Sequence, residues 1–251
     1  MSDAGQAIAV ALPAAGAPAF LMRWSGRGWA LIAPVSLVLT LAAIGLSSAS
    51  ADVITWIALI LVPPGCALGL GWAMHGARPW LAVLVLPLLA IAFAVPEEPL
   101  GELARFALLL GSTATVGRLL AAGAPLPWLK VGVVAMATID AILIFGHTLP
   151  HQYAAFDAAV PAAGLPQLHL MDFRTVTTDY GDFFLAGVVG AIFAAEGRSQ
   201  LAGAVATLIA TQLLNQLLLV VRSVPETLSP AAVLVVFELW ARVRQQRSRQ
   251  A

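Results

Sequence analysis

The sequence predicts an all-α membrane protein, a polytopic bundle of about eight transmembrane helices. Of its 251 residues, 60% are hydrophobic and only 10% are charged, and the mean hydropathy is +0.91. Apolar runs of about 20 residues recur along the chain, which is the length that a helix needs to cross a hydrocarbon core of about 30 Å. Thirteen basic and thirteen acidic residues give zero net charge. We therefore expect the lipid bilayer as a partner and no nucleic acid.

The first 28 residues do not fit a membrane span. No Lys or Arg precedes Arg23, and the apolar part is interrupted by Pro13, Gly16 and Pro18. This pattern fits neither a secretory signal nor a complete transmembrane helix. We predict that residues 1–28 form a mobile or surface-lying N-terminal tail.

Residues 29–127 are predicted to hold four N-terminal transmembrane helices. In the second span, Pro63 and Pro64 each remove a backbone donor and should kink the helix. The fourth span carries Glu102 and Arg105, which are spaced to pair on one helix face. The four expected spans are Trp29–Leu46, Val53–Met74, Trp80–Val95 and Gly101–Ala122.

Residues 128–243 are predicted to hold four further helices, which carry the candidate chemistry. The segment 150–178 is read as a loop, because prolines and glycines punctuate it, and residues 244–251 form a basic tail. The four expected spans are Trp128–Leu149, Tyr180–Ala195, Leu201–Val221 and Pro225–Val243.

The basic residues predict the orientation of the eight spans. Only Arg174 and Arg222 fall on one side of the expected membrane, and Arg105 lies within a span. By the positive-inside rule both termini are then cytoplasmic and the loop 150–178 faces outward. The ten residues expected on the cytoplasmic side are Arg23, Arg27, Arg78, Arg118, Lys130, Arg198, Arg242, Arg244, Arg247 and Arg249.

Two carboxylates lie inside apolar runs. Asp140 is flanked by Val131–Ile139 and Ala141–Phe145, and Asp182 opens the sixth span. An ionised side chain at such depth costs at least a few kcal/mol, so a functional role is the default interpretation. If the fifth span ends at Leu149, Asp140 lies about 13 Å below the outer boundary, at about 1.5 Å per residue. Asp182 enters from the same side, so two antiparallel neighbours can present both carboxylates to one wet pocket.

Two such carboxylates titrate as a pair, with one charged and one neutral. The charged member can take a proton from water while the neutral member protonates the scissile amide, as in aspartic proteases. This chemistry requires neither a cofactor nor a metal. His147 and His151 are spaced i, i+4, but Pro150 between them indicates a helix end, so we predict no metal site there.

The neighbours of the two aspartates fit the same chemistry. Gly181 has no side chain, so a substrate backbone could approach Asp182 closely. Asp179 stands three residues before Asp182 and is expected to cap the helix N-terminus. Prolines and small residues in Pro225–Ala232 interrupt a helix start and would leave irregular backbone groups with which an extended substrate could pair.

These residues resemble the intramembrane aspartyl proteases of the presenilin and signal peptide peptidase type. That family has an aspartate, often preceded by tyrosine, in one helix, a GxGD motif in the next, and a Pro-Ala-Leu motif in the last. The corresponding segments here are Ile139-Asp140, Asp179-Tyr180-Gly181-Asp182 and Pro230-Ala231-Ala232. Ile139 replaces the tyrosine, Asp179 the first glycine and Ala232 the leucine. The resemblance covers the chain from Trp128 onward.

The resemblance implies a presenilin-like fold and an intramembrane aspartic endopeptidase, although the family usually has nine spans. It implies that Asp140 and Asp182 are catalytic. Its substrates would be single-span membrane segments with cytoplasmic N-termini, such as remnant signal peptides. The residues that would contact substrate are Tyr180, Gly181, Pro230, Ala231 and Ala232.

Two other functions remain open. Asp140 and Asp182 could serve a proton- or cation-coupled transporter or channel for small solutes, or the chain could be a non-catalytic membrane scaffold. A relay does not need Gly181 or the Pro230 motif, and the inverted repeat that a transporter often has is not found. A scaffold should tolerate Asp140→Asn and Asp182→Asn.

Overall fold

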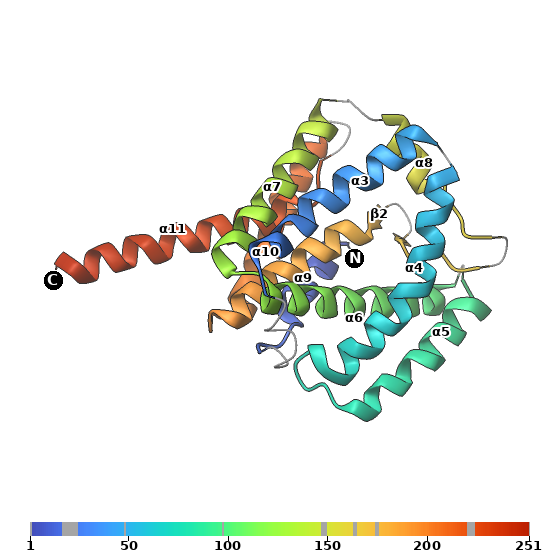
Figure 1. Cartoon of the computed structure of the whole chain (residues 1–251), viewed down its shortest axis with the longest axis horizontal. Helices are drawn as coiled ribbons and strands as arrows, with labels where there is room; N and C mark the ends of the chain where they lie inside the picture. Colours follow the sequence, from blue (N-terminus) through green and yellow to red (C-terminus); the bar gives the residue numbers. More distant parts are fainter. Residues whose placement is uncertain are drawn as a thin grey trace.

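The computed structural model is a helical bundle with one two-stranded hairpin (Figure 1). It describes residues 2–16, 25–47, 49–96, 98–146, 150–162, 165–173, 176–219 and 224–250. The helices are α1 (Ser2–Ala11), α3 (Ile32–Leu46), α4 (Ala49–Leu68), α5 (Val85–Ala94), α6 (Pro99–Gly123), α7 (Leu126–Phe145), α8 (Pro150–Asp157), α9 (Tyr180–Ala195), α10 (Gln200–Asn215) and α11 (Leu228–Gln250). Four short helical segments join them: η1 (Arg27–Leu31), η2 (Gly69–Ala73), η3 (Pro79–Leu84) and η4 (Gln216–Leu219).

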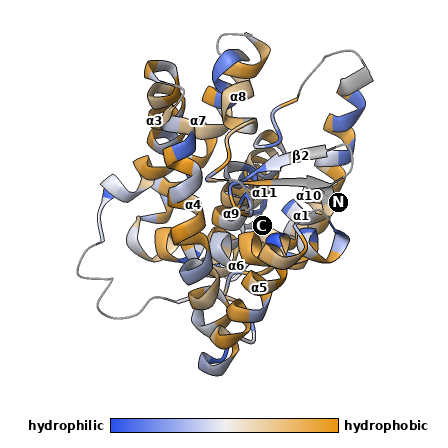
Figure 2. Cartoon of the chain, turned by 90° about the vertical axis from the view of Figure 1, so that its right-hand side faces the viewer, coloured by the Kyte–Doolittle hydropathy of each residue, from blue (hydrophilic) through white to orange (hydrophobic). Residues whose placement is uncertain are grey.

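Within the described residues, four helices are long and apolar enough to cross a membrane: Arg27–Leu46, Ala49–Ala73, Pro99–Gly123 and Leu126–Phe145. Figure 2 shows hydrophobic residues predominating along α3, α4 and α5. Many large apolar side chains on these helices are exposed, for example Leu39, Ile60 and Leu86. A soluble protein rarely exposes so much apolar surface, so the arrangement is compatible with a membrane protein.

The all-α prediction agrees with this architecture, and each of the eight predicted apolar segments contains a helix. The number of membrane crossings stays a prediction, because Pro79–Ala94 and Tyr180–Ala195 are shorter than the four candidate spans. Pro63 and Pro64 lie inside α4, which continues as the π-helical segment η2. Arg105 donates from Nη2 to the Pro96 carbonyl at 2.9 Å, instead of forming the expected pair on its own helix.

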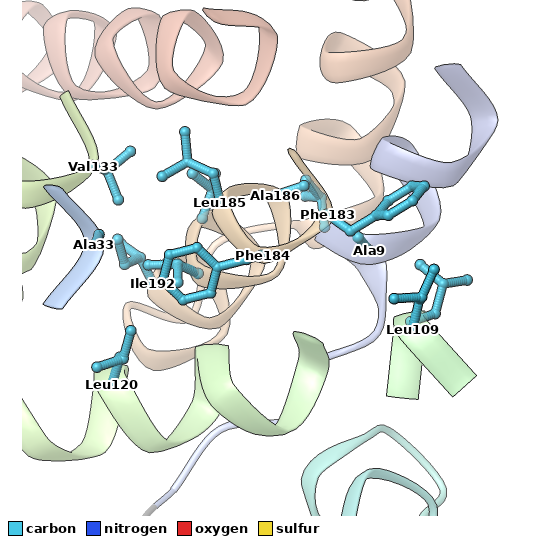
Figure 3. Close-up of a cluster of buried hydrophobic side chains, with 14 of the residues drawn as sticks. Ala9, Ala33, Leu109, Leu120, Val133, Phe183, Phe184, Leu185, Ala186 and Ile192 are labelled. Atoms are coloured by element: carbon cyan, nitrogen blue, oxygen red, sulfur yellow. The ribbon is translucent and has the colours of Figure 1, made fainter. Parts of the chain in front are cut away.

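Helix α9 forms the centre of the bundle. Every residue from Phe183 to Phe193 is buried, which is the behaviour of a helix that is apolar all round. Figure 3 shows its side chains pointing in several directions, with Ala9 of α1, Leu120 of α6 and Val133 of α7 around it. Glycines permit the closest approaches, since a Cβ on Gly190 would lie 2.2 Å from the Val10 carbonyl oxygen of α1. Small residues let helix backbones pack this tightly in a membrane protein.

The prediction of a mobile or surface-lying N-terminal tail is wrong for α1. This helix packs against α9 and α10, and Gln6, Ala9 and Val10 are fully buried. Sequence hydropathy could not show this, because a ten-residue helix is too short to span and its burial depends on a space that α9 and α10 create. Arg118 of α6 fixes the chain after α1, with Nε donating to the Gly16 carbonyl at 2.8 Å.

The segment 150–178 is more ordered than a loop. It contains α8 and an antiparallel hairpin of β1 (Leu170–Phe173) and β2 (Val176–Asp179), in which Leu170 pairs with Asp179. The backbone N–H of Tyr180 donates to the His169 carbonyl at 2.9 Å. The hairpin thus leads directly into the first turn of α9, where three of the predicted site residues lie.

Candidate functional site

Asp179 and Asp182 together form the N-terminal cap of α9. Asp179 Oδ1 accepts from the backbone N–H of Asp182 at 3.1 Å, and Asp182 Oδ2 accepts from the backbone N–H of Asp179 at 3.3 Å. This reciprocal capping box satisfies two backbone donors that a helix start leaves free. The predicted capping role of Asp179 is confirmed. The cap also fixes the position of the Asp182 carboxylate at the positive end of the α9 dipole.

Asp140 lies on α7 and is buried, with 5% of its surface exposed. Its Oδ2 accepts a hydrogen bond of 2.6 Å from the Thr227 hydroxyl, which comes from the turn before α11. Thr227 is itself buried. A short hydrogen bond of this kind orients a buried carboxylate and offsets part of its desolvation.

Asp140 and Asp182 belong to one group of acids. The charges that act on Asp182 come from Asp179, Glu226 and Asp140. These residues belong to α7, the start of α9 and the turn before α11, so three segments distant in sequence converge. Like charges gathered in a low-dielectric site repel one another strongly.

Sequence reasoning singled out the segment Pro225–Ala232 but not the side chains that matter within it. Glu226 joins the group of acids, and Gln6 of α1 donates from Nε2 to both the carbonyl and the Oε2 of Glu226, at 3.2 and 3.3 Å. Gln6 Oε1 in turn accepts from the Thr211 hydroxyl at 3.2 Å. Glu226 and Thr227 are polar and stand a few residues before the Pro230 motif, and this could have marked them as site residues. Nothing in the sequence links Gln6 to this site.

The remaining predicted substrate contacts fall into two groups. Tyr180 and Gly181 are half-buried at the start of α9, and the Tyr180 hydroxyl lies 2.9 Å from Ser112 Oγ of α6. A Cβ on Gly181 would lie 2.9 Å from Asp179 Oδ1, so this glycine leaves room for the capping carboxylate. In α11, Pro230 and Ala231 are buried, whereas Ala232 is exposed.

A second charged cluster lies at the C-terminal end of α9. Lys130 of α7 pairs with Glu196 and, at 2.7 Å, with Glu238 of α11. Arg198 pairs with Glu196 at 2.8 Å and with Glu238 at 2.6 Å. We call these four residues the ion-pair cluster. Glu238 therefore pairs across helices and not with Arg242 of its own helix, as its spacing alone would indicate.

Helix geometry gives the separation of the two clusters. Lys130 and Asp140 are ten residues apart on α7, and Asp182 and Glu196 are fourteen apart on α9. At about 1.5 Å per residue these intervals are about 15 and 21 Å. The acids and the ion-pair cluster are therefore about 15 to 21 Å apart along the helix axes.

Comparisons of the chain with protein-family models, with curated proteins and with solved structures found no match. Over the described part of the chain, no group of three His, Cys, Asp or Glu side chains is arranged to hold a metal ion. The functional argument therefore depends on the geometry of the acids and of the residues that contact them.

Proposed function

We propose that the chain is an intramembrane aspartic endopeptidase in which Asp140 and Asp182 are the catalytic pair. The observation that carries the proposal is that α7 brings buried Asp140 to the turn before α11, through its hydrogen bond with Thr227, within electrostatic range of Asp182 at the capped start of α9. Neighbouring carboxylates share protons, so one member is charged while the other is neutral. The apolar bundle around α9 supplies the water-poor surroundings in which such a pair acts on a peptide bond.

In the proposed reaction, the ionised carboxylate takes a proton from a water molecule, whose oxygen attacks the carbonyl carbon of the substrate. The neutral carboxyl polarises the carbonyl oxygen and then protonates the leaving nitrogen. The C–N bond breaks, and water adds as OH to the acyl fragment and as H to the amine. Thr227 orients Asp140 through its 2.6 Å hydrogen bond, and the α9 cap orients Asp182.

The proposed substrate is a single-span, signal-peptide-like membrane segment, unwound locally at the depth of the acids. Gly181 directly precedes Asp182 at the start of α9. Pro230 and Ala231 are buried at the start of α11, a few residues after Glu226. We propose that the substrate backbone lies between these two helix starts. In this proposal the ion-pair cluster and both termini are on the cytoplasmic side, which follows the distribution of basic residues.

One observation favours a second function. Three further acids, Asp179, Glu226 and Asp140, lie within electrostatic range of Asp182, whereas a protease needs two in all. A larger acidic group at membrane depth also suits a proton- or cation-coupled transporter or channel. The two functions differ in their products, because only the protease converts a peptide into two fragments.

The test is cleavage of a single-span reporter peptide by the purified protein in liposomes, with fragments identified by mass. Wild type should cut the reporter within its apolar segment, and Asp140→Ala and Asp182→Ala should not. Asp52→Asn, which changes an exposed carboxylate at the start of α4, is the matched control and should cut normally. Absence of fragments from wild type across reporters, together with acid-dependent ion uptake into the liposomes, would replace the protease with the transport relay.

A further inference from the structure

A groove between α10 and α11 lies beside the ion-pair cluster and has no role in the proposed reaction. Its volume is about 610 Å³, within the range of roughly 300–1,000 Å³ for sites that hold a small organic ligand. Five of its lining residues come from α11, spaced so that they share one face of the helix, and three come from the turn before α10 and its first turn. They are Val236, Phe237, Trp240, Ala241 and Arg244, with Arg198, Ser199 and Ala202 opposite.

The groove combines an apolar wall with positive charge. Val236 and Trp240 are 60% and 53% exposed, so water would meet a large apolar surface if nothing covered it. Two charged side chains line the groove, and both are arginines, Arg198 and Arg244. The occupant that complements this wall is therefore amphipathic, with an apolar chain and an anionic group.

Both arginines are positioned for an anion. The Arg244 guanidinium lies over the Trp240 ring at 3.7 Å from its centroid, which holds an exposed side chain beside the groove. Arg198 directs two nitrogens to Glu196 and Glu238, while its buried Nη1 has no hydrogen-bond partner among the described residues. A planar guanidinium with a free donor suits a phosphate oxygen.

The location of the groove identifies the source of the amphipathic ligand. Trp240 follows the ion-pair cluster on α11, and α11 then continues away from the bundle as a basic helix (Figure 1). A tryptophan followed by clustered arginines is typical of the boundary between hydrocarbon and headgroups. A ligand there would have its apolar part at the depth of Val236 and Phe237 and its anionic part at the depth of Arg244.

We propose that this groove binds an anionic phospholipid, with an acyl chain along Ala202, Phe237 and Trp240 and its phosphate on Arg198 and Arg244. The inference needs the ends of α10 and α11 to lie at a membrane surface, and it does not depend on the protease. Through Arg198 the lipid would contact the ion-pair cluster, and so would stabilise the packing of α7, α9 and α11 on one another.

The experiment is native mass spectrometry of the delipidated full-length protein, titrated with phosphatidylglycerol or with phosphatidylcholine of the same acyl chains. One phosphatidylglycerol should bind about tenfold more tightly than phosphatidylcholine, because both offer a phosphate but the choline cation of the second is repelled by Arg198 and Arg244. Arg244→Gln should remove this preference. Arg242→Gln, which loses the same charge from the same exposed stretch of helix outside the groove, should retain it.

Ala202→Trp provides a second variant, because it fills the groove from an exposed position on α10. It should weaken the bound lipid whatever its headgroup, while thermal unfolding of the protein without lipid stays near wild type. Equal losses in Arg244→Gln and Arg242→Gln would mean a general attraction of the basic helix to anions and would overturn the proposal. It would equally be overturned by competition from glycerol phosphate at concentrations comparable to the lipid, or by equal binding of the two lipids.

Discussion

Both ends of α9, where α7 and α11 pack against it, gather charged side chains, but with opposite balance. At one end two cations and two acids form the ion-pair cluster, in which each cation contacts both carboxylates. At the other end the charges acting on Asp182 are those of three further acids. In the first arrangement the positive and negative charges balance, so a contribution to the stability of the fold is enough to explain it. The second costs free energy in the folded state, which is the expected mark of a site retained for function.

Replacing Asp140 with asparagine should have the largest effect on activity. Cleavage of the reporter should fall by at least about 1,000-fold, because one member of the proposed acid–base pair is lost, and the residual rate is measured by fragment mass. The free energy of unfolding, measured by titration with sodium dodecyl sulfate, should stay the same or rise, since like-charge repulsion is relieved. A large loss of stability in this variant would mean that Asp140 is a structural residue.

Breaking the ion-pair cluster should affect stability instead. Lys130→Met leaves Glu196 and Glu238 with Arg198 as their remaining partner, and the side chains concerned are 17–26% exposed. We expect a loss of about 2 kcal/mol, between the values for exposed and buried pairs. Unfolding titrations of Lys130→Met, Glu238→Met and the double variant measure it, and the double variant should recover part of the loss. Strict additivity of the two losses would show that the pair does not interact.

Removing the hydroxyl that orients Asp140 should have a smaller effect. Thr227→Val removes the 2.6 Å hydrogen bond and should lower kcat/KM about tenfold, the consequence of losing one hydrogen bond to a charged group. Thr227→Ser keeps the hydroxyl and should stay close to wild type. If valine and serine variants cleave at the same rate, Thr227 has no part in positioning Asp140.

The smallest expected effect concerns the link from α1 to the acids. Gln6→Leu removes the hydrogen bonds to Glu226 and Thr211 and should cost about 1 kcal/mol of stability. Ala4→Leu, an exposed change on the same helix, should cost nothing measurable. Unfolding titrations compare the two variants, and an equal response would indicate that α1 contributes no specific contact to this end of the bundle.

Hydropathy predicted the helices well because their apolar composition is a local property of the chain. The bounds expected for α9, Tyr180–Ala195, are those observed, since Asp179 caps its start and Gly197, with a positive φ of 65°, follows its end. The capping role of Asp179 was also predictable, because it depends on residues only three positions apart.

What escaped prediction depends on contacts between distant segments. The burial of α1 requires the space between α9 and α10, and the pairing of Glu238 with Lys130 and Arg198 requires the packing of α11 on α7. Spacing along one helix suggested Arg242 instead. The roles of Glu226 and Thr227 likewise arise only when the turn before α11 meets α7 and α9.

The most direct test compares the two ends of α9 in one assay. Asp182→Asn removes a carboxylate from the first turn and Glu196→Gln removes one from the C-terminal end, and both are measured for reporter cleavage per folded molecule in the same liposomes. We expect Asp182→Asn to be folded and inactive, and Glu196→Gln to be less stable but as active per folded molecule as wild type. Cleavage at the wild-type rate by Asp182→Asn would contradict the proposed catalytic pair, whatever the behaviour of Glu196→Gln.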